Sequence, residues 1–235
     1  MKAVVLAGGK GTRMSNVSEK QKVMLEAAGK PILGHNVELL KKHGITDIVF
    51  CVSHRKEEVE NYFGDGEKFG VRIEYAVDNG MGTAGAVKRL DNKFKESFLV
   101  IYGDVYSELN LKDFFGFHKG KKGLASLAVH PNDHPHDSTI VVMDREKAIT
   151  GFIECPKPGT KFVNMVSAAC YALEPEALKH IPKNKKVDFA RGLFPAMVKE
   201  GEKIYGYETQ DYMKDIGTPE RIGEVERHLR REAKA

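Results

Sequence analysis

Three glycines near the start of the chain, Gly8, Gly9 and Gly11, follow a short apolar run, and Thr12 and Arg13 come directly after them. Glycine lets a backbone approach an anion without a Cβ clash, and its N–H groups can point at phosphate oxygens. A basic side chain in the same loop can neutralise charge on a phosphate group that leaves. The spacing fits neither the P-loop pattern nor the dinucleotide-binding fingerprint. It predicts a phosphate-binding loop, with a plain strand-to-helix turn as the alternative.

Two aspartates are candidates for holding a metal-bound phosphate. Asp104 follows the apolar run Phe98–Tyr102, which predicts a buried strand, and Asp215 stands in a loop just before Gly217. In open α/β sheets, ligands bind at the carboxyl ends of strands. Magnesium prefers a few carboxylates together with phosphate oxygens and water. The pair therefore predicts a Mg²⁺ site, although a single aspartate after a strand is commonly a turn residue or a helix cap.

The elements that must position these residues alternate in the first half of the chain. Short apolar runs predict buried strands, and apolar residues at helical spacing predict the helices between them. This rhythm indicates an α/β, Rossmann-like fold with a mostly parallel central sheet and helices on both faces. The predicted strands are Ala3–Ala7, Asp47–Val52, Val71–Val77 and Phe98–Tyr102, and the predicted helices are Pro31–His43, Lys56–Phe63 and Ala84–Leu90.

Strands with short connections dominate the second half. No Pro/Ser-rich linker, low-complexity tract or internal repeat interrupts the sequence, which favours a single domain over residues 1–235. The predicted strands are Leu124–His130, Ile140–Asp144, Ile149–Glu154, Ser167–Leu173 and Ile204–Glu208, and the predicted helices are Pro175–His180, Phe189–Lys199 and Pro219–Ala233.

Composition narrows the class of protein. The 235 residues include 41% hydrophobic and 30% charged residues with a net charge of +4, which is typical of a globular protein and compatible with a phosphorylated substrate. No basic stripe with interleaved aromatics is present, so we expect no nucleic-acid partner. No apolar run approaches the roughly 20 residues of a membrane helix, and the start of the chain lacks signal-peptide features. Three scattered cysteines (Cys51, Cys155 and Cys170) form no disulfide framework, which favours a cytoplasmic location.

Ordered motifs extend the glycine loop over nearly the whole chain. The loop reads Gly-Gly-x-Gly-Thr-Arg-Met, and together with the later segments it resembles the sugar nucleotidyltransferase (NDP-sugar pyrophosphorylase) superfamily. Lys22 stands where that family has a phosphate-binding lysine. The later segments are Gly29-Lys30-Pro31, Gly82-Thr83-Ala84-Gly85-Ala86, Tyr102-Gly103-Asp104-Val105, Ile153-Glu154-Cys155-Pro156-Lys157, Val166-Ser167-Ala168-Ala169-Cys170-Tyr171 and Tyr212-Met213-Lys214-Asp215-Ile216-Gly217-Thr218-Pro219.

The resemblance implies an enzyme that joins a nucleoside triphosphate to a sugar 1-phosphate and releases pyrophosphate, for nucleotide-sugar synthesis that feeds polysaccharides or the cell envelope. It implies catalytic roles for Arg13, Lys22, Asp104 and Asp215, with Mg²⁺ on the two aspartates. Residues 1–110 are then the nucleotide-binding half and residues 111–235 the sugar-phosphate-binding half. The implied nucleotide-binding residues are Leu6, Ala7, Gly8, Gly9, Gly11, Thr12, Arg13, Lys22, Asp78, Gly82, Thr83 and Gly103. The implied sugar-phosphate-binding residues are Thr139, Glu154, Lys157, Ser167 and Asp188.

Several positions depart from the family pattern. The prolines that flank the family's phosphate-binding lysine are absent, since Gln21 and Val23 flank Lys22. Cys155 replaces the lysine that contacts the sugar phosphate, and we expect Lys157 to substitute, because side chains on one side of a strand repeat every two residues. Ala169 replaces a glycine, and Met213 replaces a tryptophan. Most of these changes lie on the sugar side, so the sequence leaves the sugar open.

Two features favour GTP as the nucleotide. A carboxylate at Asp78 can accept hydrogen bonds from N1–H and N2–H₂ of guanine, whereas uracil and thymine offer one donor and suit an amide. The segment His130–Ser138, with three histidines and two aspartates, resembles a loop of the branch that acts on heptose or mannose 1-phosphate with GTP. We expect it to line the sugar pocket; two prolines break any regular spacing for a metal site.

Alternatives remain open at this point. The same reaction could use UTP, dTTP or CTP with another sugar or alditol phosphate, or the chain could be an inactive regulatory homologue that binds nucleotide sugars. Retention of Arg13, Lys22, Asp104 and Asp215 favours the enzyme. The final predicted segment is a helix, so we expect none of the β-helix extension of longer family members. We expect no membrane partner and leave open whether the chain forms a homodimer.

Overall fold

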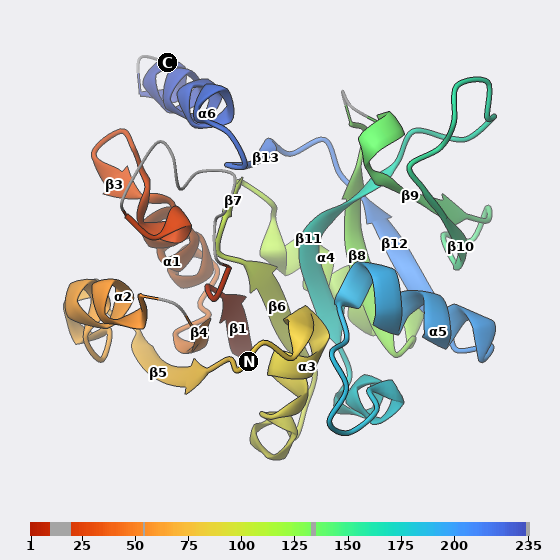
Figure 1. Ribbon diagram of the computed structural model, residues 1–235, viewed down its shortest axis with the longest axis horizontal. Coiled ribbons are helices and arrows are strands. Elements are labelled where there is room, and N and C mark those ends of the chain that lie inside the picture. The colour runs from red at the N-terminus through yellow and green to blue at the C-terminus, as the bar shows by residue number, and fades with distance from the viewer. Residues whose placement is uncertain (10–19, 54, 133–134, 234–235) are drawn as a thin grey trace. The chain divides into compact units, whose positions relative to one another are not determined.

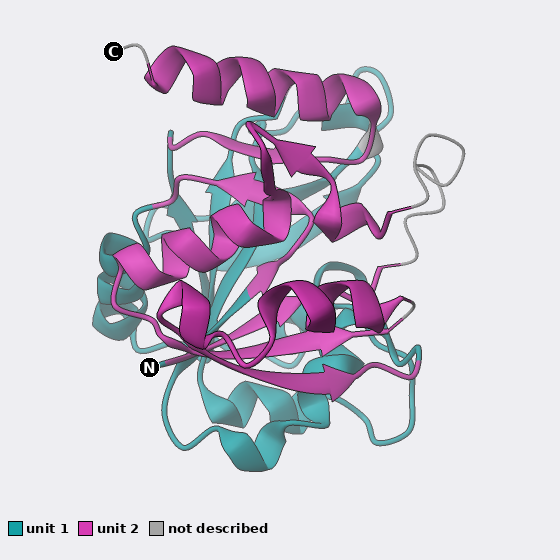
Figure 2. Cartoon of the chain, turned by 90° about the vertical axis from the view of Figure 1, so that its left-hand side faces the viewer, with its two compact units in different colours: residues 1, 80–100, 110–210 teal, residues 2–79, 101–109, 211–235 magenta. Residues whose placement is uncertain are grey.

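The computed structural model describes two compact units, which Figure 2 shows in different colours. Residues 1–9, 20–53, 55–132 and 135–233 are described. Strand β6 (Phe98–Tyr102) is divided between the units, with its first three residues in unit 1 and its last two in unit 2. Unit 2 comprises residues 2–79, 101–109 and 211–235, and unit 1 comprises residues 1, 80–100 and 110–210.

Unit 2 contains a parallel sheet with helical crossovers (Figure 1). The end of β6 neighbours β1 (Lys2–Leu6), and β1 pairs in parallel with β4 (Asp47–Val52), which pairs in parallel with β5 (Arg72–Val77). Five consecutive residues of β4 are buried, which shows that both faces of this sheet are covered. The crossovers contain α1 (Ile32–Lys42) and α2 (Lys56–Phe63). Pro31 precedes α1 and Gly44, with a φ of 73°, follows it, so both ends match the predicted signals.

Short elements and helix α6 complete unit 2, and they bring its three sequence segments into contact. An apolar cluster packs α6 against β2, α1, β7 and β13, and its members are Leu25, Ala27, Ile32, Tyr106, Ile216 and Val225, with Tyr212, Ile222 and Leu229 beside them. The short elements are η1 (Lys22–Met24), β2 (Glu26–Ala27), β3 (Lys30–Pro31), η2 (Glu67–Phe69), β7 (Val105–Ser107) and β13 (Met213–Asp215), followed by helix α6 (Pro219–Glu232).

Unit 1 has a mixed sheet. β9 (Thr139–Met143) lies between β10 (Ile149–Glu154) and β11 (Val166–Leu173), and it pairs with both in antiparallel fashion. β8 (Ala125–His130) is antiparallel to β11 and parallel to β12 (Ile204–Glu208). The helices are α3 (Gly82–Lys88), α4 (Leu111–Lys121), α5 (Phe194–Lys199), the 3₁₀ turns η3 (Asp91–Lys93), η4 (Pro135–Asp137) and η5 (Pro175–His180), and the π-helix η6 (Phe189–Leu193).

The predicted α/β fold with a mostly parallel central sheet is confirmed, with its antiparallel pairs in unit 1. Every predicted strand is present within one residue at each end. The helix α4 was not predicted, and the helix expected over Phe189–Lys199 is a π-helix that continues into α5. Among the described residues, no helix is both long and apolar enough to cross a membrane.

A buried polar group joins α4 to the sheet of unit 1. His118 is 1% exposed, its Nδ1 lies 3.0 Å from Ser126 Oγ, and its Nε2 lies 3.4 Å from Glu174 Oε1. Ser97 Oγ donates to the same Glu174 oxygen at 2.5 Å, and Lys119 lies 3.4 Å from it. Burial lowers the pKa of His118; the Glu174 charge opposes this shift, and the Lys119 charge adds to it. The histidine is therefore held in its neutral form.

We expect acid to destabilise the fold partly through His118. The pKa of His118 is lower in the folded protein than in the unfolded protein. Its contribution to the unfolding free energy is therefore fully present above the ordinary histidine pKa of about 6.5 and is lost as the pH falls below that value. His118→Gln should flatten the dependence of the unfolding free energy on pH, by at most about 1.4 kcal/mol per pH unit. Urea unfolding of both proteins between about pH 7.5 and 5.5 measures this. Parallel curves for the two proteins would contradict the assignment.

Candidate active site

Gly103 and Asp104 follow β6, and both belong to unit 2. The N–H of Gly103 donates to the carbonyl oxygen of Leu6, the last residue of β1, at 2.9 Å. A Cβ on Gly103 would lie 3.1 Å from that oxygen and 3.3 Å from the side chains of Leu33 and Val23. Glycine therefore allows this close approach, which places Asp104 beside the carboxyl end of β1, the edge at which parallel sheets bind ligands.

Lys22 and Asp104 form the central ion pair of this edge. Lys22 Nζ donates to Asp104 Oδ2 at 2.6 Å, and the two side chains are only 14% and 30% exposed. The predicted phosphate lysine and the predicted metal ligand are thus in direct contact, although 82 residues separate them in sequence. A phosphate oxygen arriving here would meet a cation that is already positioned.

Gln21 explains how Lys22 is held without the flanking prolines. Its side-chain Nε2 donates to the carbonyl oxygen of Ala7 at 2.6 Å, and its backbone N–H donates to Glu58 Oε2 at 2.8 Å. A proline at position 21 could make neither bond, because it has no N–H and no amide side chain. Gln21 therefore replaces a rigid ring by two hydrogen bonds, a role that the sequence analysis missed.

Asp215 lies next to Asp104. β13 pairs with β7 so that Asp215 is opposite Val105, and the N–H of Ile216 donates to the carbonyl oxygen of Asp104 at 3.0 Å. Arg221 Nη1, from the first turn of α6, lies 2.6 Å and 2.5 Å from the two carboxylate oxygens of Asp215. The N–H of Gly217 adds a bond of 3.0 Å to Oδ1. Arg221 lies just beyond the recognised motif, which is why the sequence analysis did not single it out.

The charges around Asp215 keep it ionised. Burial acts to raise its pKa, but the hydrogen bond and charge of Arg221, the N–H of Gly217 and the charge of Lys22 outweigh burial and lower the pKa. Two carboxylates on paired backbone segments suit a hard divalent cation. No group of three or more His, Cys, Asp or Glu side chains suited to a metal is found among the described residues. The pair fits Mg²⁺, which takes few carboxylates and completes its shell with phosphate and water.

The glycine loop is described only at its start. The N–H of Ala7 donates to the carbonyl oxygen of Cys51 at 2.8 Å, which extends the β1–β4 pairing beyond Leu6. Ser53 Oγ donates to the carbonyl oxygen of Gly8, and a Cβ on Gly8 would lie 3.1 Å from that hydroxyl. Gly9 has open space where a Cβ would stand. Gly11, Thr12 and Arg13 lie outside the described residues, so their roles stay predictions.

Asp78 follows β5 at the same edge of the sheet in unit 2. Its N–H donates to the carbonyl oxygen of Val52 at 2.7 Å, so the pairing of β4 and β5 continues to this residue. Burial raises the pKa of the Cys51 thiol to about 12, and the charge of Asp78 adds to this shift. The carboxylate thus lies near the carboxyl ends of β4 and β5, where a nucleobase reader is expected.

In unit 1, two residues predicted for different substrates contact each other. The N–H and the hydroxyl of Thr83 donate to Asp188 Oδ1 at 3.0 Å and 3.3 Å, and the N–H of Phe189 donates to Thr83 Oγ1 at 3.0 Å. Gly82 has a φ of 78°, and a Cβ on it would lie 2.5 Å from the carbonyl oxygen of Val187. The start of α3 is therefore fixed against the segment before η6.

The other predicted sugar-phosphate residues gather on neighbouring strands of unit 1. Thr139 and Glu154 are opposite each other on β9 and β10, and Ser167 is the second residue of β11, which pairs with β9. β10 ends at Glu154, and Cys155 has a φ of 42°, so the alternation along a strand does not reach Lys157. Lys157 therefore does not follow Cys155 on the same side of a strand, contrary to our expectation. The role of Lys157 stays a prediction from the resemblance alone.

The loop over His130–Ser138 is tied to its neighbours by hydrogen bonds. His136 Nδ1 lies 2.7 Å from the carbonyl oxygen of Pro156, and Asn132 Nδ2 donates to Ser138 Oγ at 2.6 Å. Residues 133–134 lie outside the described residues. In the described part of the loop, no three metal-ligating side chains are grouped.

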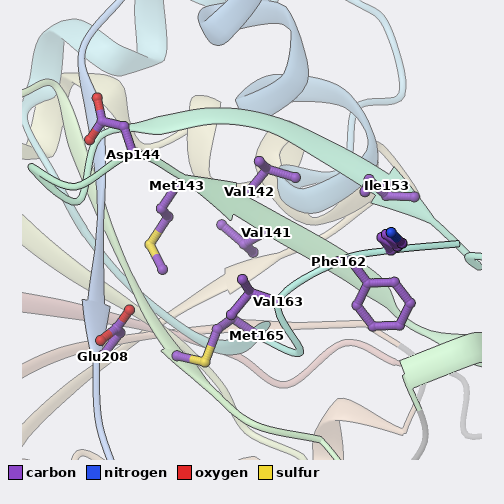
Figure 3. Close-up of a pocket in the computed structure, with 10 residues that line it drawn as sticks. Val141, Val142, Met143, Asp144, Ile153, Phe162, Val163, Met165 and Glu208 are labelled. Atoms are coloured by element: carbon purple, nitrogen blue, oxygen red, sulfur yellow. The ribbon is translucent and has the colours of Figure 1, made fainter.

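An apolar pocket of about 190 Å³ lies elsewhere in unit 1 (Figure 3). Side chains of β9, of residues 161–163 and of Met165 line it, with Asp144 and Glu208 at one end. None of the predicted sugar-phosphate residues lines this pocket. It is therefore separate from the predicted site.

Parallel strands, a glycine turn and a lysine–carboxylate pair at their carboxyl ends define an α/β protein with a candidate phosphate site. Residues 2–232 match the nucleotidyl transferase family, and the chain belongs to that family.

Two curated relatives and one solved structure are similar to this chain. Mannose-1-phosphate guanylyltransferase of Mycobacterium tuberculosis is 33% identical over 93% of this chain and 61% of its own length. UTP–glucose-1-phosphate uridylyltransferase of Synechocystis is 32% identical over 92% and 60%. The chain thus spans about 60% of the length of these relatives. HddC from Yersinia pseudotuberculosis, complexed with GMP-PN, shares the fold at a TM-score of 0.82 and 24% identity, over 97% of this chain and 99% of that one.

We expect Asp188→Ala to lower the unfolding free energy by about 1–3 kcal/mol, because it leaves the N–H and hydroxyl of Thr83 without their acceptor. Asp188→Asn keeps an acceptor oxygen and should retain most of the stability. Denaturant unfolding of the three proteins measures this, with Glu176→Ala, at an exposed carboxylate, as the control. Equal losses from Asp188→Ala and Glu176→Ala would show that the contact contributes nothing.

Proposed function

We propose that this chain is a sugar-1-phosphate nucleotidyltransferase, which joins a nucleoside triphosphate, preferably GTP, to a sugar 1-phosphate of the mannose or heptose type. The observation that carries the proposal is the contact of Lys22 with Asp104 at the carboxyl end of β1, next to Asp215. A binding protein without catalysis would have no need for a lysine and two carboxylates grouped at one strand edge.

The reaction requires positioning and charge more than covalent help. An oxygen of the sugar phosphate attacks the α-phosphorus in line, the bond from that phosphorus to the bridging oxygen breaks, and pyrophosphate leaves with the electron pair. The attacking phosphate is already ionised, so no general base is needed. Lys22 would neutralise the α-phosphate or the incoming phosphate, and Arg13, assigned from the resemblance, would neutralise the pyrophosphate.

Members of this family generally use a divalent metal ion. Asp104 and Asp215 would hold Mg²⁺, which supplies positive charge to the triphosphate and orients the α-phosphate when bound. Lys22 would then exchange its carboxylate partner for a phosphate oxygen.

Relatives support the nucleotide choice without deciding it. Relatives named mannose-1-phosphate guanylyltransferase and one named UTP–glucose-1-phosphate uridylyltransferase match this chain at comparable identity. Asp78 at the end of β5 is the residue of this chain that favours guanine, since a carboxylate suits its two donors. UTP, dTTP or CTP with another sugar or alditol phosphate is the alternative.

The proposal also covers the domain organisation, the oligomeric state and the location of the protein. The assignment of residues 1–235 to one nucleotidyltransferase domain, with a nucleotide-binding half up to residue 110, is a proposal, as are the homodimer and the cytoplasmic location. Thr139, Glu154, Lys157, Ser167 and Asp188 are proposed for the sugar-phosphate half.

Catalysis is tested by pyrophosphate release from four nucleoside triphosphates with a panel of sugar 1-phosphates. Lys22→Ala, Asp104→Asn and Arg13→Ala should each reduce turnover by about two orders of magnitude or more, the size of one lost transition-state contact. Excess EDTA should abolish turnover. Lys20→Ala, whose lysine pairs with Glu26 and is 59% exposed, is the matched control and should stay near wild type. Near-full activity of Asp104→Asn at saturating Mg²⁺ would refute the metal assignment.

Base selectivity is tested by Asp78→Asn. The preference in kcat/KM for GTP over UTP should fall by about 1–3 kcal/mol, because the amide has one acceptor oxygen in place of two and lacks the charge that strengthens both bonds to guanine. Asp91→Asn removes a carboxylate that pairs with Lys88 and should leave selectivity unchanged. Wild-type protein that uses UTP or dTTP at least as efficiently as GTP would refute the guanine assignment and leave the reaction class intact.

A further inference from the structure

Arg221 holds Asp215 in a geometry that leaves neither carboxylate oxygen free of a protein partner. The guanidinium Nη1 lies 2.6 Å from Oδ1 and 2.5 Å from Oδ2, and the N–H of Gly217 also donates to Oδ1 at 3.0 Å. Charge-assisted bonds of this length are the strong class of hydrogen bonds. Arg221 therefore competes for the same oxygens that a divalent cation would need.

The local backbone is built for this contact. A Cβ on Gly217 would lie 2.7 Å from Asp215 Oδ1 and 3.5 Å from Arg221 Nη1, so a larger residue would push the carboxylate away from the arginine. Ile216 and Val225 are fully buried in the apolar cluster that anchors both sides of this turn, with Ile222 packed against it. The start of α6 is thus fixed, and Arg221 is held close to Asp215.

The charges of the two ion pairs at this edge of the sheet cancel within the protein. Lys22 neutralises Asp104 and Arg221 neutralises Asp215, so that the four formal charges cancel. A divalent cation alone therefore gains little net attraction from this edge of the sheet, and it competes with a guanidinium for the oxygens of Asp215. A triphosphate brings several negative charges, which give both the cation and the displaced basic groups a partner.

We propose that Arg221 is a positioning residue that occupies the Asp215 carboxylate in the nucleotide-free protein, so that the divalent cation binds together with the triphosphate and not before it. The inference rests on the proposed function, because it takes Asp104 and Asp215 as the metal pair. It adds a role for a residue outside the phosphate loop and the metal pair.

The test is Mn²⁺ binding to the full chain, followed by the electron paramagnetic resonance signal of free Mn²⁺, first without nucleotide and then with the triphosphate that supports pyrophosphate release. Arg221→Met should bind Mn²⁺ alone at least about tenfold more tightly than wild type, the size of one hydrogen bond to a charged group. The added triphosphate should tighten Mn²⁺ binding less in this variant than in wild type. Arg230→Met is the matched control, because Arg230 pairs with Glu226 on the same helix and is 71% exposed. It should behave as wild type.

Two further variants keep the result decisive. Arg221→Gln retains a hydrogen-bond donor without the charge and replaces Arg221→Met if that variant unfolds; it should also tighten Mn²⁺ binding. Arg221→Met combined with Asp215→Asn should lose the gain. Unchanged or weaker Mn²⁺ binding by the Arg221 variants overturns the inference while wild-type turnover keeps the proposed function. Wild-type protein that neither releases pyrophosphate nor binds Mn²⁺ more tightly with triphosphate refutes the proposed function itself.

Discussion

The hydrogen bond from Gly103 to the carbonyl oxygen of Leu6 is the constraint on which the site depends. It joins the ends of β6 and β1, and glycine suits the position because a Cβ there would lie only 3.1 Å from the Leu6 oxygen and 3.3 Å from the side chains of Leu33 and Val23. Once Gly103 is fixed, Asp104 lies at the strand edge within reach of Lys22. The carbonyl oxygen of the same aspartate then accepts from Ile216 and brings Asp215 alongside. Two successive backbone contacts thus position both carboxylates, and the side chain of Lys22 reaches the first of them.

The sequence predicted the parallel strands and the helices of unit 2 well, because such strands are short, continuous apolar runs and their crossovers have clear end signals. The short strands β2, β3, β7 and β13 were not predicted. The bounds of β4 and α2 agree with prediction to the residue. Helix α4 was not predicted because Gly116, Gly120 and three lysines interrupt the apolar pattern of its sequence. Its start does carry a signal, since the side chain of Asn110 caps it by accepting from the N–H of Asp113.

The site was only partly predictable, and the difference is geometric. Motif matching put Lys22 and Asp104 in one site, and the structure gives them a direct contact. It could not find Arg221, whose contact depends on the turn at Gly217, or Gln21, which replaces a proline by hydrogen bonds. Ala169 stands where the family pattern has glycine, and it adopts a φ of 54° at the bulge of β11. A non-glycine residue there carries backbone strain of about 1 kcal/mol.

The interleaving of the two units in the sequence sets an order for folding during translation. Apart from Met1, all residues of unit 1 lie between positions 80 and 210, so its sheet can assemble while the ribosome is still adding residues 211–235. Unit 2 must wait, because Ile216 and Val225 cover apolar side chains of Leu25 and Ile32 that were synthesised long before. Until residues 211–235 emerge, the nascent chain exposes that surface and holds Lys22 and Asp104 without Asp215. The candidate phosphate site is therefore completed only once residues 211–235 have been synthesised, when unit 1 is already able to fold.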